Sequence, residues 1–81
     1  KRQPLVRAIT LMGRGTDADI RVEDPGVSRK HCEIVVGNPA IIRDLKSTNG
    51  TFVDGIRIDE CTLTEGAIVK LGGTAFTFRS S

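Results

Sequence analysis

The chain has 81 residues, which is enough for one small domain that buries only about two-thirds of its unfolded surface. Its 12 cationic and 10 acidic residues leave a formal net charge of +2, and its three aromatic residues are all phenylalanine. This balance argues against a nucleic-acid or membrane-surface partner, because stacking platforms and a continuous basic stripe are both lacking. No apolar run is long enough to cross a membrane.

Residues 1–81 are interpreted as a single domain from a longer cytoplasmic protein, since the chain opens with Lys1 rather than methionine and carries no signal segment. The two cysteines, Cys32 and Cys61, fit neither a zinc motif nor a redox CxxC spacing. We expect ordinary thiols in a reducing compartment, with a disulfide as the alternative. One histidine and two distant cysteines do not make a ligand set, so no metal and no cofactor are expected.

Alternating and β-branched runs recur along the chain, whereas no window keeps a helical apolar period over the roughly ten residues that a helix needs. Turn signals such as "EDPG", "KSTNG" and "LGG" separate the runs. We predict an all-β fold, an antiparallel β-sandwich of two packed sheets, with a small barrel as the alternative. The expected strands are, in chain order, Leu5–Arg7, Ile9–Met12, Asp19–Val22, His31–Val36, Ala40–Asp44, Thr51–Val53, Arg57–Ile58, Ile68–Leu71 and Thr74–Arg79.

Two enzyme interpretations find little support. The stretch "GRGTDA" matches a dinucleotide-binding fingerprint, with Glu33 at the distance of a ribose-binding carboxylate, but "ADIRVEDPG" after it does not open a helix. Ser28, His31 and Asp44 supply the residue types of a hydrolase triad, yet "GVSRKH" is not a G-x-S-x-G elbow. We therefore expect no catalytic activity and interpret His31 as a hydrogen-bonded structural residue.

Polar and cationic side chains concentrate in the connecting segments, above all in "DPGVSRKHCEI" at the mouth of a predicted strand. Because the loops of a sandwich cluster at the ends of its sheets, these side chains can meet at one apex. Guanidinium and hydroxyl groups bind phosphate oxygens, and glycines let backbone N–H groups face an anion. We predict an anion site, with solvated turn residues as the alternative. The candidates are Arg14, Ser28, Arg29, Lys30, Lys46, Ser47, Thr48 and Asn49, beside Gly13, Gly15, Gly26 and Gly50.

Three short blocks occur in an order that resembles a known family. "GR" at Gly13-Arg14, "SRKH" at Ser28–His31 and "STNG" at Ser47–Gly50 are similar to the signature blocks of the forkhead-associated (FHA) domain of bacterial type. The likeness extends from about Met12 to the end of the chain, and it includes "RDLKSTNGTFVDG" and the closing "LGG" hairpin. It implies a β-sandwich of about eleven short strands that binds phosphothreonine in protein partners.

The resemblance implies a role for five loop residues. Arg14 would make the charged contact to the phosphate, and Ser28 would donate its hydroxyl to a second oxygen. Arg29 would contact the phosphate through its backbone or side chain, and Thr48 would close the cradle. Asn49 would hydrogen-bond the peptide backbone beside the phosphothreonine and so fix the direction of the ligand.

Three further residues would support the site. His31 resembles the family's structural histidine, which braces the loops that carry the second and third blocks, Gly13 belongs to the first block, and Gly50 would supply a positive φ. Two positions depart from the pattern. Gly26 stands where some relatives carry a side chain that selects a residue of the ligand, and Asp54 stands where many have asparagine.

These inferences lead to a non-catalytic module that recognises phosphothreonine in partner proteins, or in its own parent chain, within Ser/Thr kinase signalling. Its partners would be a Ser/Thr protein kinase or the substrates of that kinase. Two rival functions remain: a phospho-independent interaction domain that uses an exposed sheet face, and a nucleic-acid binder that uses the same cations. The ten acidic residues and the lack of Tyr and Trp argue against the second rival.

Overall fold

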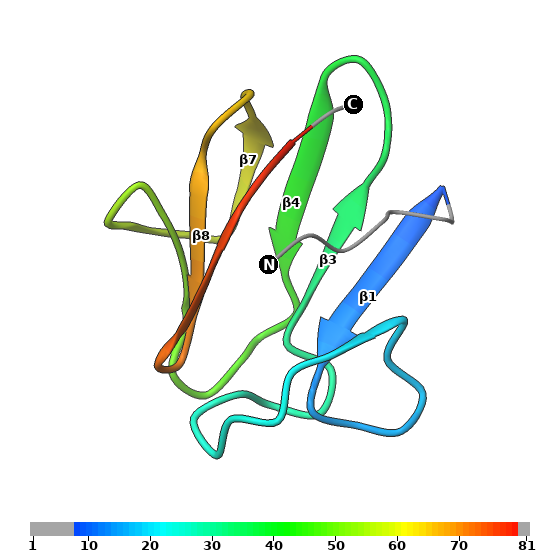
Figure 1. The fold of residues 1–81 in the computed structure, drawn as a ribbon, viewed down its shortest axis with the longest axis vertical. Helices are drawn as coiled ribbons and strands as arrows, with labels where there is room; N and C mark the ends of the chain where they lie inside the picture. The colour runs from blue at the N-terminus through cyan, green and yellow to red at the C-terminus, as the bar shows by residue number, and fades with distance from the viewer. Residues whose placement is uncertain (1–7, 80–81) are drawn as a thin grey trace.

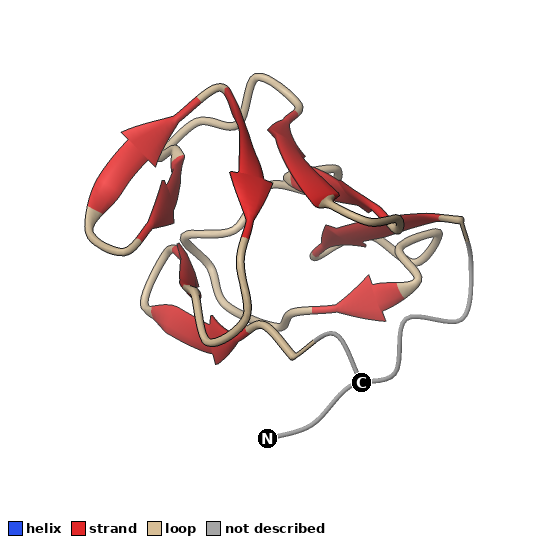
Figure 2. Ribbon diagram, turned by 90° about the horizontal axis from the view of Figure 1, so that it is seen from above, coloured by secondary structure: helices blue, strands red, loops and turns tan. Residues whose placement is uncertain are grey.

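The computed structural model describes residues 8–79, which form two β-sheets packed face to face (Figure 1). Figure 2 shows this part of the chain built from strands joined by loops and turns, with no helix in the described range. No helix within residues 8–79 is long and apolar enough to span a membrane. The strands are β1 Ile9–Gly13, β2 Ile20–Arg21, β3 Cys32–Val35, β4 Ala40–Asp44, β5 Thr51–Val53, β6 Ile56–Ile58, β7 Glu60–Leu63, β8 Ile68–Leu71 and β9 Thr74–Thr77.

One sheet has the strand order β2-β1-β3-β4-β7, and the other has the order β6-β5-β8-β9. Neighbouring strands are antiparallel in every pair except β1 and β2, which run parallel with Met12 opposite Ile20. The all-β sandwich predicted from the sequence is confirmed, with nine strands among residues 8–79 in place of about eleven.

The predicted strands differ from the observed ones mainly in three places, besides shifts of one residue at the ends of β1, β3 and β6. Strand β7 was not predicted, because only Cys61 and Leu63 of its four residues are apolar. The stretch expected to run from Asp19 to Val22 forms only the two-residue strand β2, and the last strand ends at Thr77 rather than Arg79. The predicted strand at residues 5–7 lies outside the described residues.

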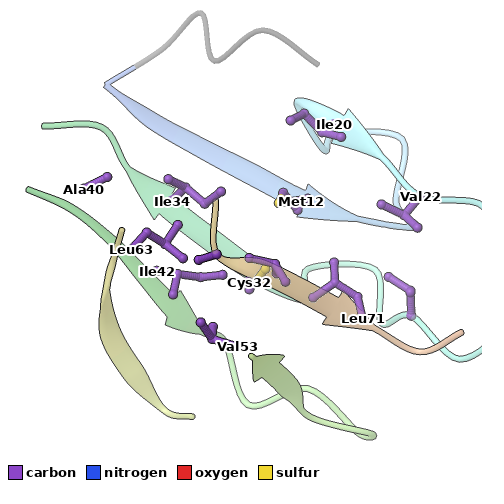
Figure 3. Close-up of a cluster of buried hydrophobic side chains, with 13 residues drawn as sticks. Met12, Ile20, Val22, Cys32, Ile34, Ala40, Ile42, Val53, Leu63 and Leu71 are labelled. Carbon is purple, nitrogen blue, oxygen red and sulfur yellow. The ribbon is translucent and has the colours of Figure 1, made fainter. Parts of the chain in front are cut away.

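The hydrophobic core lies between the two sheets, as the close-up in Figure 3 shows. Strand alternation explains its composition. In β3, Cys32 and Ile34 point inward and are almost completely buried, while Glu33 and Val35 are only partly buried. The same pattern places Ile42 of β4 and Leu71 of β8 at 0% exposure. Burying a side chain of this size contributes about 2 kcal/mol, so the alternation fixes which face of each strand turns inward.

A tight turn joins β5 to β6. Asp54 has φ of 52° and Gly55 has φ of 84°, the left-handed pair that a two-residue hairpin turn requires. The Asp54 carboxylate also accepts a hydrogen bond from the backbone N–H of Ile68 at 2.9 Å. Asp54 therefore serves the turn and the neighbouring strand, which gives a structural reason for its place in the sequence.

Candidate functional site

Three loops meet at one end of the sandwich, the lower end in Figure 1. They are the β1–β2 loop (residues 14–19), the β2–β3 loop (residues 22–31) and the β4–β5 loop (residues 45–50). The turn between β8 and β9 reaches the same end. All the site residues expected from the sequence lie in these loops, except Gly13, which ends β1. The structure thus gathers segments that are far apart in the chain.

The backbones of the first two loops run side by side. The N–H of Arg14 donates to the carbonyl oxygen of Ser28 at 2.9 Å, and the N–H of Gly15 donates to the carbonyl oxygen of Arg29 at 3.1 Å. A Cβ atom on Gly13 would overlap with the Arg29 carbonyl oxygen. Glycine is required at this position because any side chain would force the two loops apart.

The exposed Arg14 side chain is fixed at its base. Its Nε donates to the carbonyl oxygen of Val27 at 3.0 Å, while Val27 itself is 1% exposed and anchored in the core. A guanidinium has five N–H donors, so this bond orients the group and leaves its terminal nitrogens for a ligand. The charged end of Arg14 is therefore held beside the residue that precedes Ser28.

Ser28 connects the second and third loops. Its hydroxyl oxygen accepts a hydrogen bond from the backbone N–H of Thr48 at 3.1 Å, across 20 residues of sequence. A serine hydroxyl that accepts this bond can still donate its own proton. The Ser28 hydroxyl therefore joins the loop that carries the exposed Thr48 to the loop whose Val27 carbonyl binds the Arg14 side chain.

His31 is completely buried beneath these loops, at 0% exposure. Its Nδ1 accepts a hydrogen bond from the backbone N–H of Ser28 at 3.0 Å, so the ring proton is on Nε2. Nε2 donates to the carbonyl oxygen of Gly50 at 2.8 Å. One imidazole thus joins the backbones of the second and third loops.

A carboxylate organises the third loop from inside. Asp44 accepts hydrogen bonds from the Ser47 hydroxyl at 2.6 Å, the Ser47 N–H at 3.1 Å and the Thr51 hydroxyl at 2.7 Å. The Ser47 hydroxyl oxygen in turn accepts from the N–H of Gly50 at 3.0 Å. Burial raises the pKa of Asp44, but the hydrogen bonds from Ser47 and Thr51 outweigh it, so the pKa is held below its usual value.

Two backbone positions in this loop have positive φ. Lys46 has φ of 57° and Gly50 has φ of 91°. The value at Gly50 agrees with the positive φ expected there from the sequence. Between them, the Asn49 side chain donates from Nδ2 to the carbonyl oxygen of Gly26 at 2.9 Å. Asn49 therefore spans from the third loop to the second, and its carbonyl oxygen remains as an acceptor.

Asp24 fastens the second loop to the β8–β9 turn. Its Oδ1 accepts from the N–H of Gly26 at 2.8 Å, and its Oδ2 accepts from the N–H of Gly73 at 2.9 Å and the hydroxyl of Thr74 at 2.8 Å. The bond from Gly26, followed by that from Thr74, lowers the pKa of Asp24. Gly72, with φ of 58°, lets the turn approach this carboxylate closely.

The cations at this end of the sandwich differ in whether a carboxylate lies close enough to form an ion pair with them. Lys30 lies 3.7 Å from the Asp17 carboxylate, and both side chains are exposed. Arg14, Arg29 and Lys46 form no ion pair with any carboxylate of residues 8–79. The site therefore combines cations that have no carboxylate partner with hydroxyl and backbone donors, which is the chemistry that binds an anion.

The same geometry does not form a hydrolase triad. The ring of His31 bonds to the Ser28 backbone and to Gly50 rather than to the Ser28 hydroxyl. Asp44 bonds to Ser47 and Thr51. A histidine in this arrangement is not placed to take a proton from the serine.

Two residues of this region were missed as supports by sequence reasoning. Asp24 was seen only as part of a turn signal and Asp44 only as a possible triad acid, although their carboxylates organise two of the three loops. The signal that points to such a role is an acid placed two or three residues before a Gly or Ser, where its side chain reaches the backbone N–H groups of the turn.

The fold and the site together define a β-sandwich binding module with a loop-built anion site at one end. A family model supports this class and makes it specific, because the FHA domain model matches residues 10–72. The chain belongs to the FHA domain family. The resemblance drawn from the three sequence blocks is confirmed.

Known relatives agree with this membership. The chain is 43% identical over 70 residues to the FHA domain-containing protein FhaA of Mycobacterium tuberculosis. The aligned residues make up 85% of this chain and 13% of FhaA. A solved FHA domain from work on phosphothreonine-dependent FHA interactions has a TM-score of 0.88 and 41% identity, covering 93% of this chain and 79% of that one. EmbR of the same bacterium, solved with a low-affinity phosphopeptide, has a TM-score of 0.92 and 40% identity. The match covers 96% of this chain and 21% of EmbR. The chain thus spans only a small part of FhaA and EmbR.

Proposed function

We propose that this domain binds phosphothreonine in protein partners, with Arg14, Ser28, Arg29, Thr48 and Asn49 as the contacting residues. The observation that carries the proposal is the bond between the Thr48 N–H and the Ser28 hydroxyl, which joins two loops beside the oriented Arg14 guanidinium. A phosphate has close to two negative charges at neutral pH and accepts charge-assisted hydrogen bonds well. Solved relatives of this fold include one with a phosphopeptide bound.

Each contacting residue has a distinct task. Arg14 neutralises the phosphate, and the Ser28 hydroxyl donates to a second oxygen. Arg29 adds charge at the rim, while Thr48 closes the cradle. Asn49 directs its side-chain carbonyl oxygen to the backbone of the ligand, while its Nδ2 stays bonded to Gly26. His31, Gly13 and Gly50 act indirectly, by keeping the loops in place.

The domain recognises the mark without catalysing a reaction, since the polar groups of the site are committed to holding loops and to binding an anion. Its partners are a Ser/Thr protein kinase or the substrates of that kinase, or a phosphorylated segment of its own parent protein. Both cysteines are free thiols, which agrees with a reducing compartment, the cytoplasm.

The test is a titration with an oriented phosphothreonine peptide library, followed by the best sequence in phosphothreonine, phosphoserine and unmodified forms. The phosphothreonine form should bind, the unmodified form should not, and added salt should weaken binding because the contacts are charged. Arg14→Ala should lower the affinity at least about a hundredfold, the cost of about 2.7 kcal/mol, with the melting temperature unchanged.

Glu65→Ala is a suitable control, because Glu65 is exposed and lies before the start of β8, whereas the end of β8 leads to the turn at the site. Equal affinity of wild type for the phosphorylated and unmodified peptides would show a phospho-independent interaction domain instead. Normal binding by Arg14→Ala would remove Arg14 from the site.

A further inference from the structure

The outer face of the four-stranded sheet carries a row of residues that the site does not use. Phe52 on β5 is paired with Arg57 on β6 and with Lys70 on β8. The residues next to Phe52 in its strand, Thr51 and Val53, are buried, so Phe52 and its two partners point away from the core. Side chains of directly paired residues lie about 5 Å apart, so the three form one continuous row.

Phe52 differs from the other two phenylalanines of the chain. Phe76 and Phe78 pack against the hydrophobic core, whereas Phe52 is half-buried and does not belong to that cluster. Ile68, on the same outer face, is 51% exposed. We call Phe52, Arg57, Ile68 and Lys70 the Phe52 face. It offers apolar surface between two cations.

The charges on this face are not compensated as they are elsewhere. On the five-stranded sheet, Arg43 is paired 2.8 Å from both Glu33 and Glu60. Arg57 and Lys70 are exposed, and neither pairs with a carboxylate of residues 8–79. The remaining cations with ion pairs in this range are Arg21, Lys30 and Arg79.

The acid in the turn after β5 does not cancel the positive charge of the row. Asp54 lies at the opposite end of β5 from the site, where its carboxylate accepts from the Ile68 N–H at 2.9 Å. No acidic residue lies among the outward positions paired with Phe52, and the row continues from Lys70 to Ala75 on β9. A ligand on this row therefore meets two cations and one aromatic ring.

The Phe52 face is continuous with the recognition loops. The Arg57 side chain lies over Gly50, close enough that a Cβ atom on Gly50 would be 2.7 Å from the Arg57 Nε. Arg57 also lines one open cleft of about 500 Å³ beside the β4–β5 loop, together with Arg43 and Lys46 and with the acids Asp44, Asp59 and Glu60. Arg57 therefore links the loop that carries Asn49 to the strand that carries Phe52.

We propose that the Phe52 face binds an acidic segment, containing an apolar side chain, that flanks the phosphothreonine in the same partner. The inference rests on the proposed function. Arg57 and Lys70 hold the carboxylates, and Phe52 receives the apolar side chain between them. Phe52 is three residues beyond Asn49, and an extended chain advances about 3.3 Å per residue, so the acids lie about three to six positions from the phosphothreonine.

An acidic peptide fits this face better than nucleic acid does. A peptide that is anchored at Asn49 reaches the face without a second independent binding event, so its flank binds at high effective concentration. Nucleic acid would need a continuous basic stripe, whereas the five-stranded sheet presents Glu33 and Glu60 beside its arginine.

The experiment uses three phosphothreonine peptides of one length and common core. One has Ser and Gly at the flanking positions, one has the segment Glu-Glu-Leu-Glu before the phosphothreonine, and one has it after. An acidic flank on one side should tighten binding about tenfold, equal to 1.4 kcal/mol, and the gain should shrink in high salt. Lys70→Gln and Arg57→Gln should each remove most of that gain and leave the affinity for the neutral peptide unchanged.

The matched control is Arg79→Gln, because Arg79 is an exposed cation that is paired with Glu65 rather than located in the row. Equal binding of all three peptides, or loss of the same affinity for all three in Lys70→Gln, would overturn the proposal while leaving phosphothreonine binding intact. Failure of every phosphopeptide to bind would overturn the proposed function as well. Tighter binding of a mixed-sequence single-stranded oligonucleotide than of the acidic peptide would assign the face to nucleic acid.

Discussion

The imidazole of His31 lies between two loops that are remote in sequence, and its Nε2 donates to the carbonyl oxygen of Gly50 across 2.8 Å. The other ring nitrogen accepts from the backbone of Ser28. This buried side chain, together with the Thr48–Ser28 and Asn49–Gly26 bonds, therefore sets the separation of the two loops. The site depends on a residue that does not itself face the ligand.

Replacing His31 with alanine should lower stability strongly. The change leaves the Ser28 N–H and the Gly50 carbonyl without partners in the interior, at a cost of about 3 kcal/mol and roughly 15 °C in melting temperature. Ser28→Ala is the matched variant, because it removes the hydroxyl and keeps the backbone bond to His31. Thermal denaturation of both variants tests this role. An unchanged melting temperature with lost peptide binding would make His31 a ligand contact instead.

Replacing Gly13 with alanine should also destabilise the domain. The new methyl group would overlap with the carbonyl oxygen of Arg29, and backbone atoms cannot move away as a flexible side chain can. We expect a loss of about 2 kcal/mol or more in the free energy of unfolding, measured by urea denaturation. Gly37→Ala provides the comparison. Gly37 is exposed, and a Cβ atom added there would lie 3.3 Å from the carbonyl oxygen of Pro39. Equal losses for the two variants would contradict the close approach of the first two loops.

The two thiols should differ in reactivity. Burial, the largest effect, raises the pKa of Cys32 to about 12, and its side chain is 0% exposed. Since the thiolate is the nucleophile, native Cys32 should not react with iodoacetamide at pH 8, whereas it should react once the chain is unfolded. Burial also raises the pKa of Cys61, but this thiol is half-buried and should react slowly in the folded protein. Mass spectrometry of the labelled peptides separates the two sites, and early labelling of Cys32 would contradict the packed core.

Sequence reasoning succeeded where the local residue pattern alone determines the backbone conformation. Alternating and β-branched runs predicted strands where β3 and β8 lie, and the family resemblance predicted the positive φ at Gly50. It failed where the partner lies far along the chain. The four residues of β7 become a strand because Ile42 and its neighbours in β4 pair with them, and Glu60 then meets Arg43. Propensity cannot show such pairing, since it depends on tertiary contacts.

The same limit applies to the site. The sequence blocks suggested which loops carry the polar groups, and the contacts between those loops emerge only from the fold. Asp24 illustrates this, because its carboxylate reaches Gly73 and Thr74, which lie 49 and 50 positions further along the chain. No local pattern around "EDPG" encodes that contact. The roles of the five contacting residues toward a phosphopeptide stay predictions until they are tested by titration.

Replacing Asp24 with asparagine should weaken the domain at neutral pH and flatten its response to acid. Hydrogen bonds from Gly26 and then Thr74 lower the pKa of Asp24 below its ordinary value of 3.8. A carboxylate with a depressed pKa stabilises the fold fully above its unfolded pKa, and this stabilisation is lost as the pH falls through the lower pKa of the folded state. Wild type should therefore lose stability below about pH 4, and the variant should lose less over the same range. Urea denaturation from pH 7 to pH 2 measures both effects.

Glu23→Gln is the control, because the exposed Glu23 carboxylate lies 3.7 Å from Arg21. An identical acid profile for wild type and Asp24→Asn would rule out Asp24 as the clamp between the second loop and the β8–β9 turn.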